Sequence, residues 1–113
     1  MTTLNNTVQL IGRAGLDPEI KSFDKERKMA RFSIATNSYY YNKNGERVDD
    51  TQWHQVVAWG KTAEVVEKLV KKGREVAVSG KLNNRSWEDK DGNKRYIVEI
   101  VLNEIHAFGK AAG

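Results

Sequence analysis

Residues 51–61 read TQWHQVVAWGK, and this stretch decides the fold of the chain. Side chains in a β-strand point alternately to its two faces. Trp53 and Trp59 therefore share one face, while Val56 and Ala58 share the other. The second pair is small and apolar, as the core side of a strand requires, so both indoles fall on the outside. We predict a strand over residues 50–59 whose tryptophans face away from the core.

The residues before this strand predict further extended segments. Residues 7–13 and 30–41 alternate between the two faces of a strand, and residues 19–23 form a shorter extended run after a break at residues 15–18. Residues 44–45 are Asn-Gly, a strong hairpin signal because both residues tolerate positive φ. We therefore expect the segment 30–41 to pair with the next strand in a long hairpin.

The residues after the strand predict a single helix. Its apolar residues recur at helical spacing: Ala63, Val66, Leu69 and Val70. Thr62 is expected to cap the start of this helix, and Gly73 to occupy the C′ position beyond its end.

Two more strands complete the predicted fold. They cover residues 75–87 and 94–102, joined across Asp91-Gly92, and residues 105–108 add a short edge segment. Three strands, one helix and two strands follow the order of the oligonucleotide-binding (OB) fold, a partly open barrel. We therefore predict an all-β, five-stranded OB barrel over residues 1–108, with one α-helix between strands three and four. Residues 109–113 form a short C-terminal end.

The composition fits one basic domain and excludes several classes of protein. The 113 residues suffice for a single core, and no cysteine is present for a disulfide, a thiolate metal site or a thiol nucleophile. No apolar run is long enough to span a membrane, and the N-terminus lacks the regions of a signal peptide, so we expect a cytoplasmic protein. A net charge of +4 is compatible with nucleic acid but does not prove it.

Basic residues and a third tryptophan share the outer side of the predicted strand 75–87. By parity, Lys81, Arg85 and Trp87 lie opposite the apolar side. A single DNA strand exposes base faces and phosphates, which indoles and cations respectively bind. One tryptophan alone is more often a half-buried packing residue, and three together also suit a protein–protein interface. Their combination with basic residues favours a surface for a nucleic-acid single strand.

Six segments of the chain carry a resemblance to a known family. They are 8–19 (VQLIGRAGLDPE), 32–36 (FSIAT), 51–61 (TQWHQVVAWGK), 69–73 (LVKKG), 76–82 (VAVSGKL) and 85–87 (RSW). In these segments the chain resembles the bacterial single-stranded DNA-binding protein family. The resemblance implies a homotetramer around which single-stranded DNA wraps without regard to sequence during replication, repair and recombination. It also implies a nucleoid-associated location in the cytoplasm.

The resemblance further implies roles for single residues. The side chains expected to stack on bases are Tyr40, Trp53, Trp59 and Trp87. The side chains expected to contact the DNA backbone are Lys21, Lys43, Lys61, Lys72 and Arg85, to which strand parity adds Lys81. Tyr40 stands where the family often has Trp, and Trp59 where Phe is frequent, so stacking should survive with altered strength. Gln55 and Asn83 occupy places that are often basic.

The C-terminal end departs from the family pattern. Family members usually continue through a flexible linker to an acidic tip that recruits replication and repair proteins. Here no acidic residue follows Glu104, which fits either a trimmed chain or a natural short form. In both cases we expect no recruitment of partner proteins through a tip.

Two other functions compete with strand binding. A nuclease would need clustered carboxylates for a metal ion, and the candidates are residues 49–50 and 88–91, the second of which brackets a hairpin turn. His54 is expected to face the barrel interior or a subunit contact, and His106 is isolated. We therefore expect no enzyme activity, no metal site and no cofactor. A protein-interaction module on the same fold would be expected to lack the full aromatic set.

Overall fold

The computed structural model describes residues 5–24 and 27–109. Its elements in chain order are β1 (Val8–Ala14), β2 (Glu19–Ser22), β3 (Lys28–Tyr41), β4 (Arg47–Trp59), α1 (Lys61–Leu69), β5 (Glu75–Glu88) and β6 (Lys94–Ala107). Within this part of the chain, no helix is long and apolar enough to cross a membrane. The predicted end at 109–113 lies, apart from Gly109, outside the described residues.

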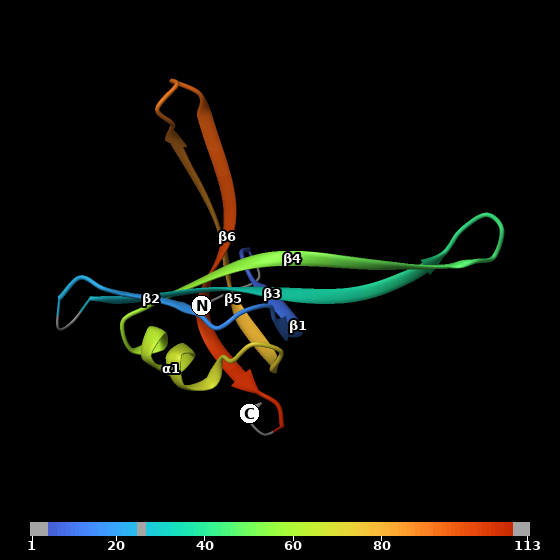
Figure 1. The fold of residues 1–113 in the computed structure, drawn as a ribbon, viewed down its shortest axis with the longest axis horizontal. Helices are drawn as coiled ribbons and strands as arrows, with labels where there is room; N and C mark the ends of the chain where they lie inside the picture. Colours follow the sequence, from blue (N-terminus) through green and yellow to red (C-terminus); the bar gives the residue numbers. More distant parts are fainter. Residues whose placement is uncertain (1–4, 25–26, 110–113) are drawn as a thin grey trace.

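Five of the strands close into a barrel (Figure 1). The sheet order is β1-β5-β6-β4-β3-β2, and β1 also pairs with β3, which joins the sheet into a ring. β2 remains as an extra strand on the edge of β3. α1 follows β4, the third strand of the ring in chain order, and precedes β5, the fourth. The predicted all-β, five-stranded OB fold is thus confirmed.

The core consists of the side chains that alternation assigns to the inner side of the strands. The largest fully buried side chains are Ile34, Val56, Val66, Val70 and Val76. Each contributes about 1.5–3 kcal/mol relative to an exposed side chain. Val66 comes from α1 and Val70 from the residue after it, so the helix covers one end of the barrel and seals the core there.

The helix begins and ends differently from the prediction. Its N-cap is Gly60, which makes no side-chain capping hydrogen bond, so Thr62 lies inside the first turn. Its C-cap is Val70, whose backbone is already extended and whose side chain is buried in the core. Gly73 is therefore not the C′ residue. It has a φ of 81° as the third residue of a turn in which the Arg74 N–H donates to the Lys71 carbonyl at 2.9 Å.

β6 runs without a break through the gap predicted between residues 102 and 105. Gly80 pairs with Leu102 and Ser79 with Glu104, which leaves Asn103 as an extra residue, a β-bulge. The bulge shifts the alternation by one residue and returns Ile105 to the core side. The prediction of a strand followed by a separate edge segment was wrong because the bulge interrupts the period of two.

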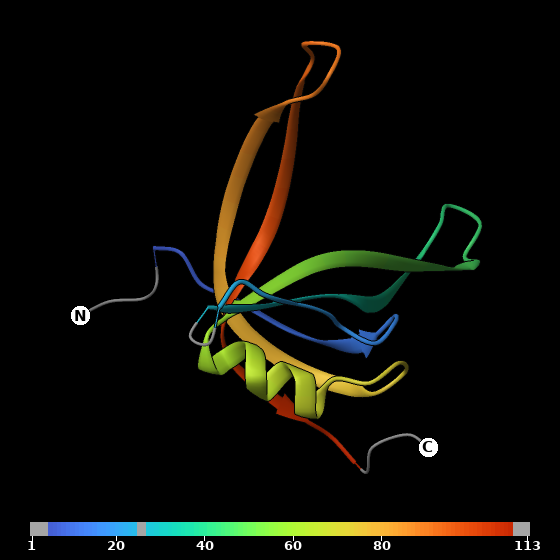
Figure 2. The same cartoon turned by 60° about the vertical axis from the view of Figure 1, so that its left-hand side comes forward.

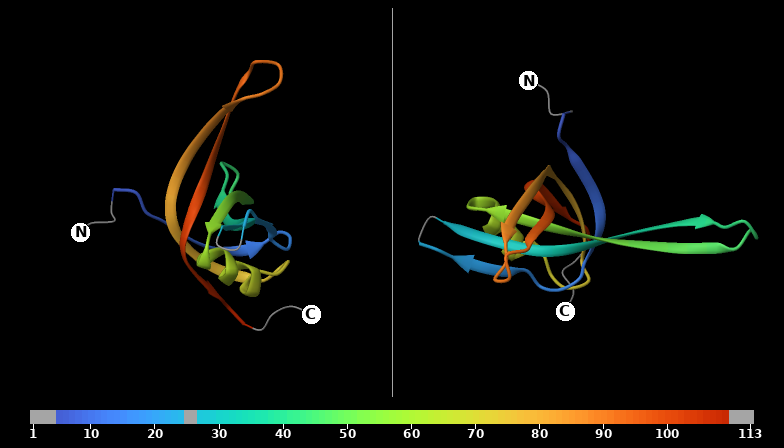
Figure 3. Two further views of the ribbon diagram at one scale, coloured as in Figure 1. Left: turned by 90° about the vertical axis from the view of Figure 1, so that its left-hand side faces the viewer. Right: turned by 90° about the horizontal axis from the view of Figure 1, so that it is seen from above.

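Two hairpins extend beyond the barrel as arms, which Figures 2 and 3 show from further directions. We call the outer part of the β3–β4 hairpin, residues 36–52, the first arm, and the outer part of the β5–β6 hairpin, residues 83–99, the second arm. β3 pairs with β4 from Met29–Trp59 to Tyr41–Arg47, which confirms the predicted long hairpin.

Each arm ends in a five-residue loop of the same kind. The loop sequences are NKNGE at 42–46 and DKDGN at 89–93. In each loop the first side chain accepts the N–H groups of the third and fifth residues, at 2.9 and 3.0 Å in 42–46 and at 3.0 and 2.9 Å in 89–93. The fourth residue is a glycine with a φ of 75° or 81°. The Asn-Gly and Asp-Gly signals thus mark two copies of one turn.

The loop carboxylate Asp89 carries a pH-dependent share of stability. Hydrogen bonds hold the pKa of Asp89 below its ordinary value of 3.8. The bond from the Asn93 N–H has the largest effect, followed by the bond from the Arg95 side chain. A lowered pKa in the folded state stabilises the fold above the ordinary pKa, and this gain is lost as the pH falls through the folded value. Asp89→Asn can keep the loop hydrogen bonds, as Asn42 does in the first arm, but not the charge.

We therefore expect Asp89→Asn to unfold at a lower temperature than the parent at neutral pH. The difference should vanish once the pH falls below the folded pKa of Asp89, because the parent carboxyl is then also neutral. Thermal unfolding followed by circular dichroism from neutral to strongly acidic pH measures this. A difference that stays constant over that range would contradict the prediction.

Candidate nucleic-acid interface

Rows of side chains cross the outside of the barrel from strand to strand. Residues directly opposite in an antiparallel pair lie on the same face. The rows on the side away from the core are Lys21–Met29–Trp59, Glu19–Arg31–Val57, Ser33–Gln55 and Arg13–Ala35–Trp53. We call this surface, with its continuation onto the second arm, the outer face. Trp53 and Trp59 are 60% and 51% exposed on it.

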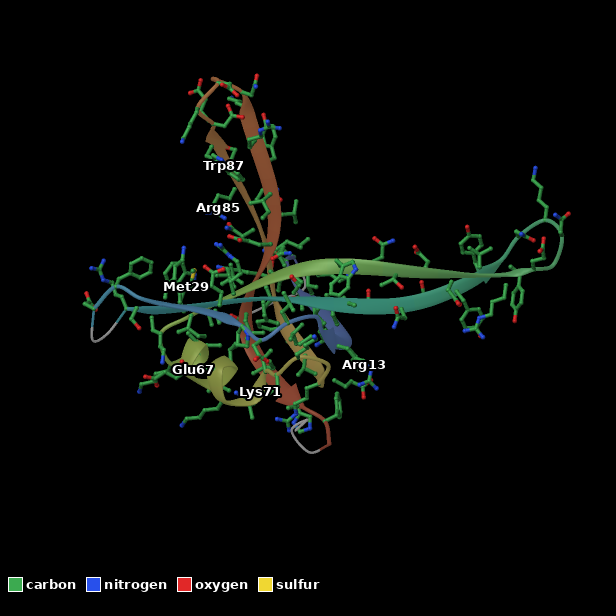
Figure 4. The ribbon with its side chains drawn as sticks, viewed as in Figure 1. Arg13, Met29, Glu67, Lys71, Arg85 and Trp87 are labelled. Atoms are coloured by element: carbon green, nitrogen blue, oxygen red, sulfur yellow. The ribbon has the colours of Figure 1, made fainter. Side chains whose placement is uncertain are left out.

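The outer face continues from β4 onto the second arm. Val57 pairs in parallel with Val101, and Lys81 pairs with Val101 from the other side. Lys81 has the same parity in β5 as Arg85 and Trp87, and Figure 4 shows the last two on this arm. The structure therefore brings three predicted tryptophans and three predicted cations, Lys21, Lys81 and Arg85, to one continuous face.

One neighbour holds each of the two barrel indoles. The Trp53 ring lies against Gly15, where an added Cβ would come within 2.7 Å of its Cζ3. Trp59 stacks on Phe23, with ring centroids 6.3 Å apart and planes at 20°. Phe23 is itself exposed and enlarges the aromatic platform. The sequence pattern does not single out Phe23, although its parity with Lys21 was a usable signal.

A buried carboxylate lies beneath the basic side chain of the second arm. Arg85 holds its guanidinium carbon 5.6 Å from the Trp87 ring centroid and its Nε 3.5 Å from Glu99 Oε1. The Glu99 side chain is 7% exposed, and its Oε2 has no hydrogen-bond partner in the structure. Glu99 therefore orients Arg85 and offsets part of its charge.

The five predicted lysines divide into two groups. Lys21 and Lys81 lie on the outer face, because their strand partners do. Lys43 lies in the loop of the first arm, Lys61 is the first residue of α1, and Lys72 lies in the turn after α1. Strand pairing does not assign this second group to a face, although all three are exposed.

Tyr40 is not brought together with the tryptophans. It pairs with Val48, which places it on the side of the β3–β4 ribbon that carries Ile34 in the barrel. Beyond the barrel this side is open, and Tyr40 is 56% exposed there. The two faces of a ribbon do not meet, so Tyr40 and Trp53 point to opposite sides of the first arm.

Two arginines outside the predicted site, Arg13 and Arg31, also lie on the outer face. Arg31 occupies one of the two rows between those of Trp53 and Trp59, next to the row of Trp59, and no described carboxylate makes an ion pair with it. Arg13 stands beside Ala35 in the row of Trp53, and its Nη1 donates to the Gly73 carbonyl at 3.0 Å. Their outward parity was readable in the sequence.

The residues considered for catalysis have structural partners. His54 lies on the core side of β4, with its Nε2 3.0 Å from Thr36 Oγ1. Asp89, from the acidic segment 88–91, holds the loop of the second arm. Over residues 5–24 and 27–109, no group of three or more His, Cys, Asp or Glu side chains could hold a metal ion.

The barrel order and the aromatic, basic outer face define a member of the OB-fold class. Sequence comparison gives the family. The profile of the "Single-strand binding protein family" matches residues 5–108, and the chain belongs to this family.

Known relatives agree in sequence and in fold. The "Single-stranded DNA-binding protein 1" of Chlorobaculum tepidum is 39% identical over 92% of this chain and 65% of its own length. The "Single-stranded DNA-binding protein 1" of Xylella fastidiosa is 41% identical over 93% of this chain and 78% of its own length. The chain thus spans less than two thirds of the first relative. A solved structure, "Plasmodium falciparum SSB complex with ssDNA", matches with a TM-score of 0.84 and 33% identity, covering 92% of this chain and 95% of that one.

Proposed function

We propose that this protein binds single-stranded DNA without regard to sequence, in replication, repair and recombination. The observation that carries the proposal is the continuous outer face with its three exposed tryptophans and intervening cations. Trp53, Trp59 and Trp87 stack on bases, and the basic side chains contact phosphates. The likeness to an SSB solved with single-stranded DNA supports the same function.

The free energies of base stacking and phosphate contact favour binding of a single strand over a duplex. Stacking of one base on an aromatic side chain contributes about 1–3 kcal/mol and is open to every base, because each has a π-face. A duplex offers only its phosphates to this surface, since its base faces are stacked on one another. Lysine and arginine neutralise phosphates in either case and release counterions. The exposed indoles are therefore the groups that favour a single strand over a duplex.

Titration with oligo-dT tests the proposal through tryptophan fluorescence. Stacked bases should quench the emission of the outer-face indoles, and added salt should reverse the quenching as counterions compete for phosphates. A duplex of the same length serves as the control and should quench far less. Emission that stays unchanged across the oligo-dT titration at low salt would rule out the proposed function.

Arg31 provides a sharper prediction for the centre of the outer face. We expect Arg31→Gln to weaken oligo-dT binding and to reduce the slope of log K against log salt by about 0.7, the value for one phosphate contact on a single strand. Lys68→Gln is the matched control, because it removes the same charge from the last turn of α1. Equal slopes for the two variants would exclude Arg31 from the interface.

The proposal includes no enzyme activity. Asp89 supports this part of the proposal. It belongs to the acidic segment 88–91, and its carboxylate accepts hydrogen bonds from the loop backbone, which is a structural role. Release of fragments from an end-labelled single strand in the presence of magnesium would contradict it. A protein with this function works where cellular single strands arise, so we place it in the cytoplasm at the nucleoid.

We further propose that the protein is a homotetramer. Ile11 is 61% exposed on β1, beside a hollow that Ala77 and His106 also line. An exposed aliphatic side chain at the edge of an apolar hollow suits contact with a second copy. Light scattering of the purified protein tests this: a mass of four chains is expected, and a monomer would contradict the proposal.

A further inference from the structure

An acidic side chain is buried on the outer face of the second arm. Over residues 5–24 and 27–109, Glu99 is the one buried residue with a polar or charged side chain. It pairs with Asn83, which has the same parity in β5 as Lys81 and Arg85. The carboxylate therefore belongs to the surface that we expect to meet the DNA backbone. A negative charge at this place opposes the binding of phosphates.

Hydrogen bonds do not compensate the buried charge of Glu99. Its Oε2 is shielded from solvent and accepts no hydrogen bond from the described residues. Gln55, on the neighbouring strand β4, donates its side-chain N–H to Ser33 Oγ at 3.0 Å and not to Glu99. A buried carboxylate without such bonds depends on a nearby cation for compensation.

Arg85 is that cation. Its Nε lies 3.5 Å from Glu99 Oε1, and no other ion pair within the described residues involves this carboxylate. The distance is long for a hydrogen bond, so the attraction between the two charges is what holds the guanidinium here. The Arg85 side chain is 47% exposed and contacts the Trp87 ring. The guanidinium is thus open to a bound strand, but its charge is already matched.

A phosphate has to compete with Glu99 for this guanidinium. If Arg85 moved to a phosphate, it would leave the buried carboxylate unpaired, which is strongly unfavourable. If Arg85 stayed in place, the phosphate would meet an ion pair without net charge, and its binding would release few counterions. Arg31 differs from Arg85, because no described carboxylate makes an ion pair with it.

We propose that Glu99 is a positioning residue that acts as an internal counter-ion: it withholds the Arg85 guanidinium from the DNA backbone and so lowers the affinity of the second arm for a single strand. The proposal rests on the proposed function, because it concerns how tightly the outer face binds the strand. Stacking on Trp87 does not depend on this charge. The second arm therefore binds bases well and phosphates weakly, whereas the barrel, with Arg31 unpaired, binds both.

Glu99→Gln tests the proposal, because it removes the charge and keeps the shape of the side chain. We expect this variant to bind end-labelled oligo-dT about fivefold more tightly than the parent at low salt, measured by fluorescence anisotropy. The slope of log K against log salt should become steeper by about 0.7, the value for one phosphate contact. Adding Arg85→Gln to Glu99→Gln should return the slope to that of the parent, because the released guanidinium is then absent. Glu64→Gln is the matched control, since it removes the same charge from the first turn of α1 and should leave the slope unchanged.

A second comparison leaves Glu99 in place. Arg85→Gln should reduce the salt slope of the parent by less than about half as much as Arg31→Gln does, because only Arg31 is free of a carboxylate partner. Equal reductions by the two variants would overturn the proposal. This comparison decides the question even if circular dichroism shows that Glu99→Gln does not fold.

The outcomes separate the role of Glu99 from the function on which it rests. If Glu99→Gln weakens binding, Glu99 holds Arg85 in a binding position, and the proposal is wrong. If the slope is unchanged, the carboxylate has a structural role alone, and the proposal is again wrong. If the double variant keeps the steeper slope, Glu99 restrains another cation, and the assignment to Arg85 is wrong. In each of these cases the parent still binds and the proposed function stands, whereas a parent without an anisotropy change at low salt overturns both.

Discussion

Gly12→Ala is expected to unfold the protein, or to lower its free energy of unfolding by more than about 4 kcal/mol. A Cβ on Gly12 would overlap the carbonyl oxygen of Ala35 and lie 2.9 Å from Ile34 Cγ1. Both atoms belong to β3, at the place where β1 leaves β5 and pairs with β3 to close the barrel. Backbone cannot yield there without opening the ring of strands, because the same residues carry the closing pairs.

Gly45→Ala provides the matched control for this substitution. Gly45 has a φ of 75° at the tip of the first arm, and no atom lies within 4 Å of its added Cβ. The free energy of unfolding of this variant should therefore fall only by the cost of an unfavourable backbone angle, about 1 kcal/mol. Urea unfolding of both variants measures the contrast. A Gly12→Ala protein as stable as the Gly45→Ala protein would show that closure of the barrel tolerates a side chain at this point.

The fold could be predicted because its signals are local. Alternation over residues 50–59 and 30–41, with Asn-Gly between the strands, defines the long hairpin before any distant contact is known. The errors arose where a distant contact overrides the local pattern. The helix ends before Val70, and the turn after it donates the Lys72 N–H to Asp17 and the Gly73 N–H to the Ala14 carbonyl. The bulge at Asn103 lets β6 change phase and stay in the barrel. Neither cause is visible in the adjacent sequence.

The candidate site was predictable within each strand but not between strands. Parity placed Trp53 and Trp59 together, and separately placed Trp87 with Arg85. Only the parallel pairing of Val57 with Val101 joins these two sets into one surface, and such a pairing has no sequence signature. Position in the family suggested Tyr40, whose pairing with Val48 puts it on the other side of the first arm, and its stacking role stays a prediction.

Loss of either barrel indole should have the largest effect on DNA binding. We expect Trp53→Ala and Trp59→Ala each to cost about 1–3 kcal/mol of binding free energy, or roughly 5- to 150-fold in affinity for oligo-dT. Each substitution removes the ring on which a base stacks, and for Trp59 also half of the stacked pair with Phe23. Both side chains are more than half exposed, so the free energy of unfolding should change little. Anisotropy of a labelled strand measures the affinity, and urea unfolding measures the stability.

Tyr96→Ala is the control that separates stacking on the outer face from a general loss of exposed aromatic surface. Tyr96 is 73% exposed on the second arm, but it pairs with Ser86, on the opposite side from Trp87. It should bind oligo-dT like the parent, and Trp53→Phe should retain most of the affinity because a flat ring remains. If Tyr96→Ala weakens binding as much as Trp53→Ala, the strand does not follow the outer face. If Trp53→Ala and Trp59→Ala both bind like the parent, the indoles serve another partner and stacking does not hold the strand.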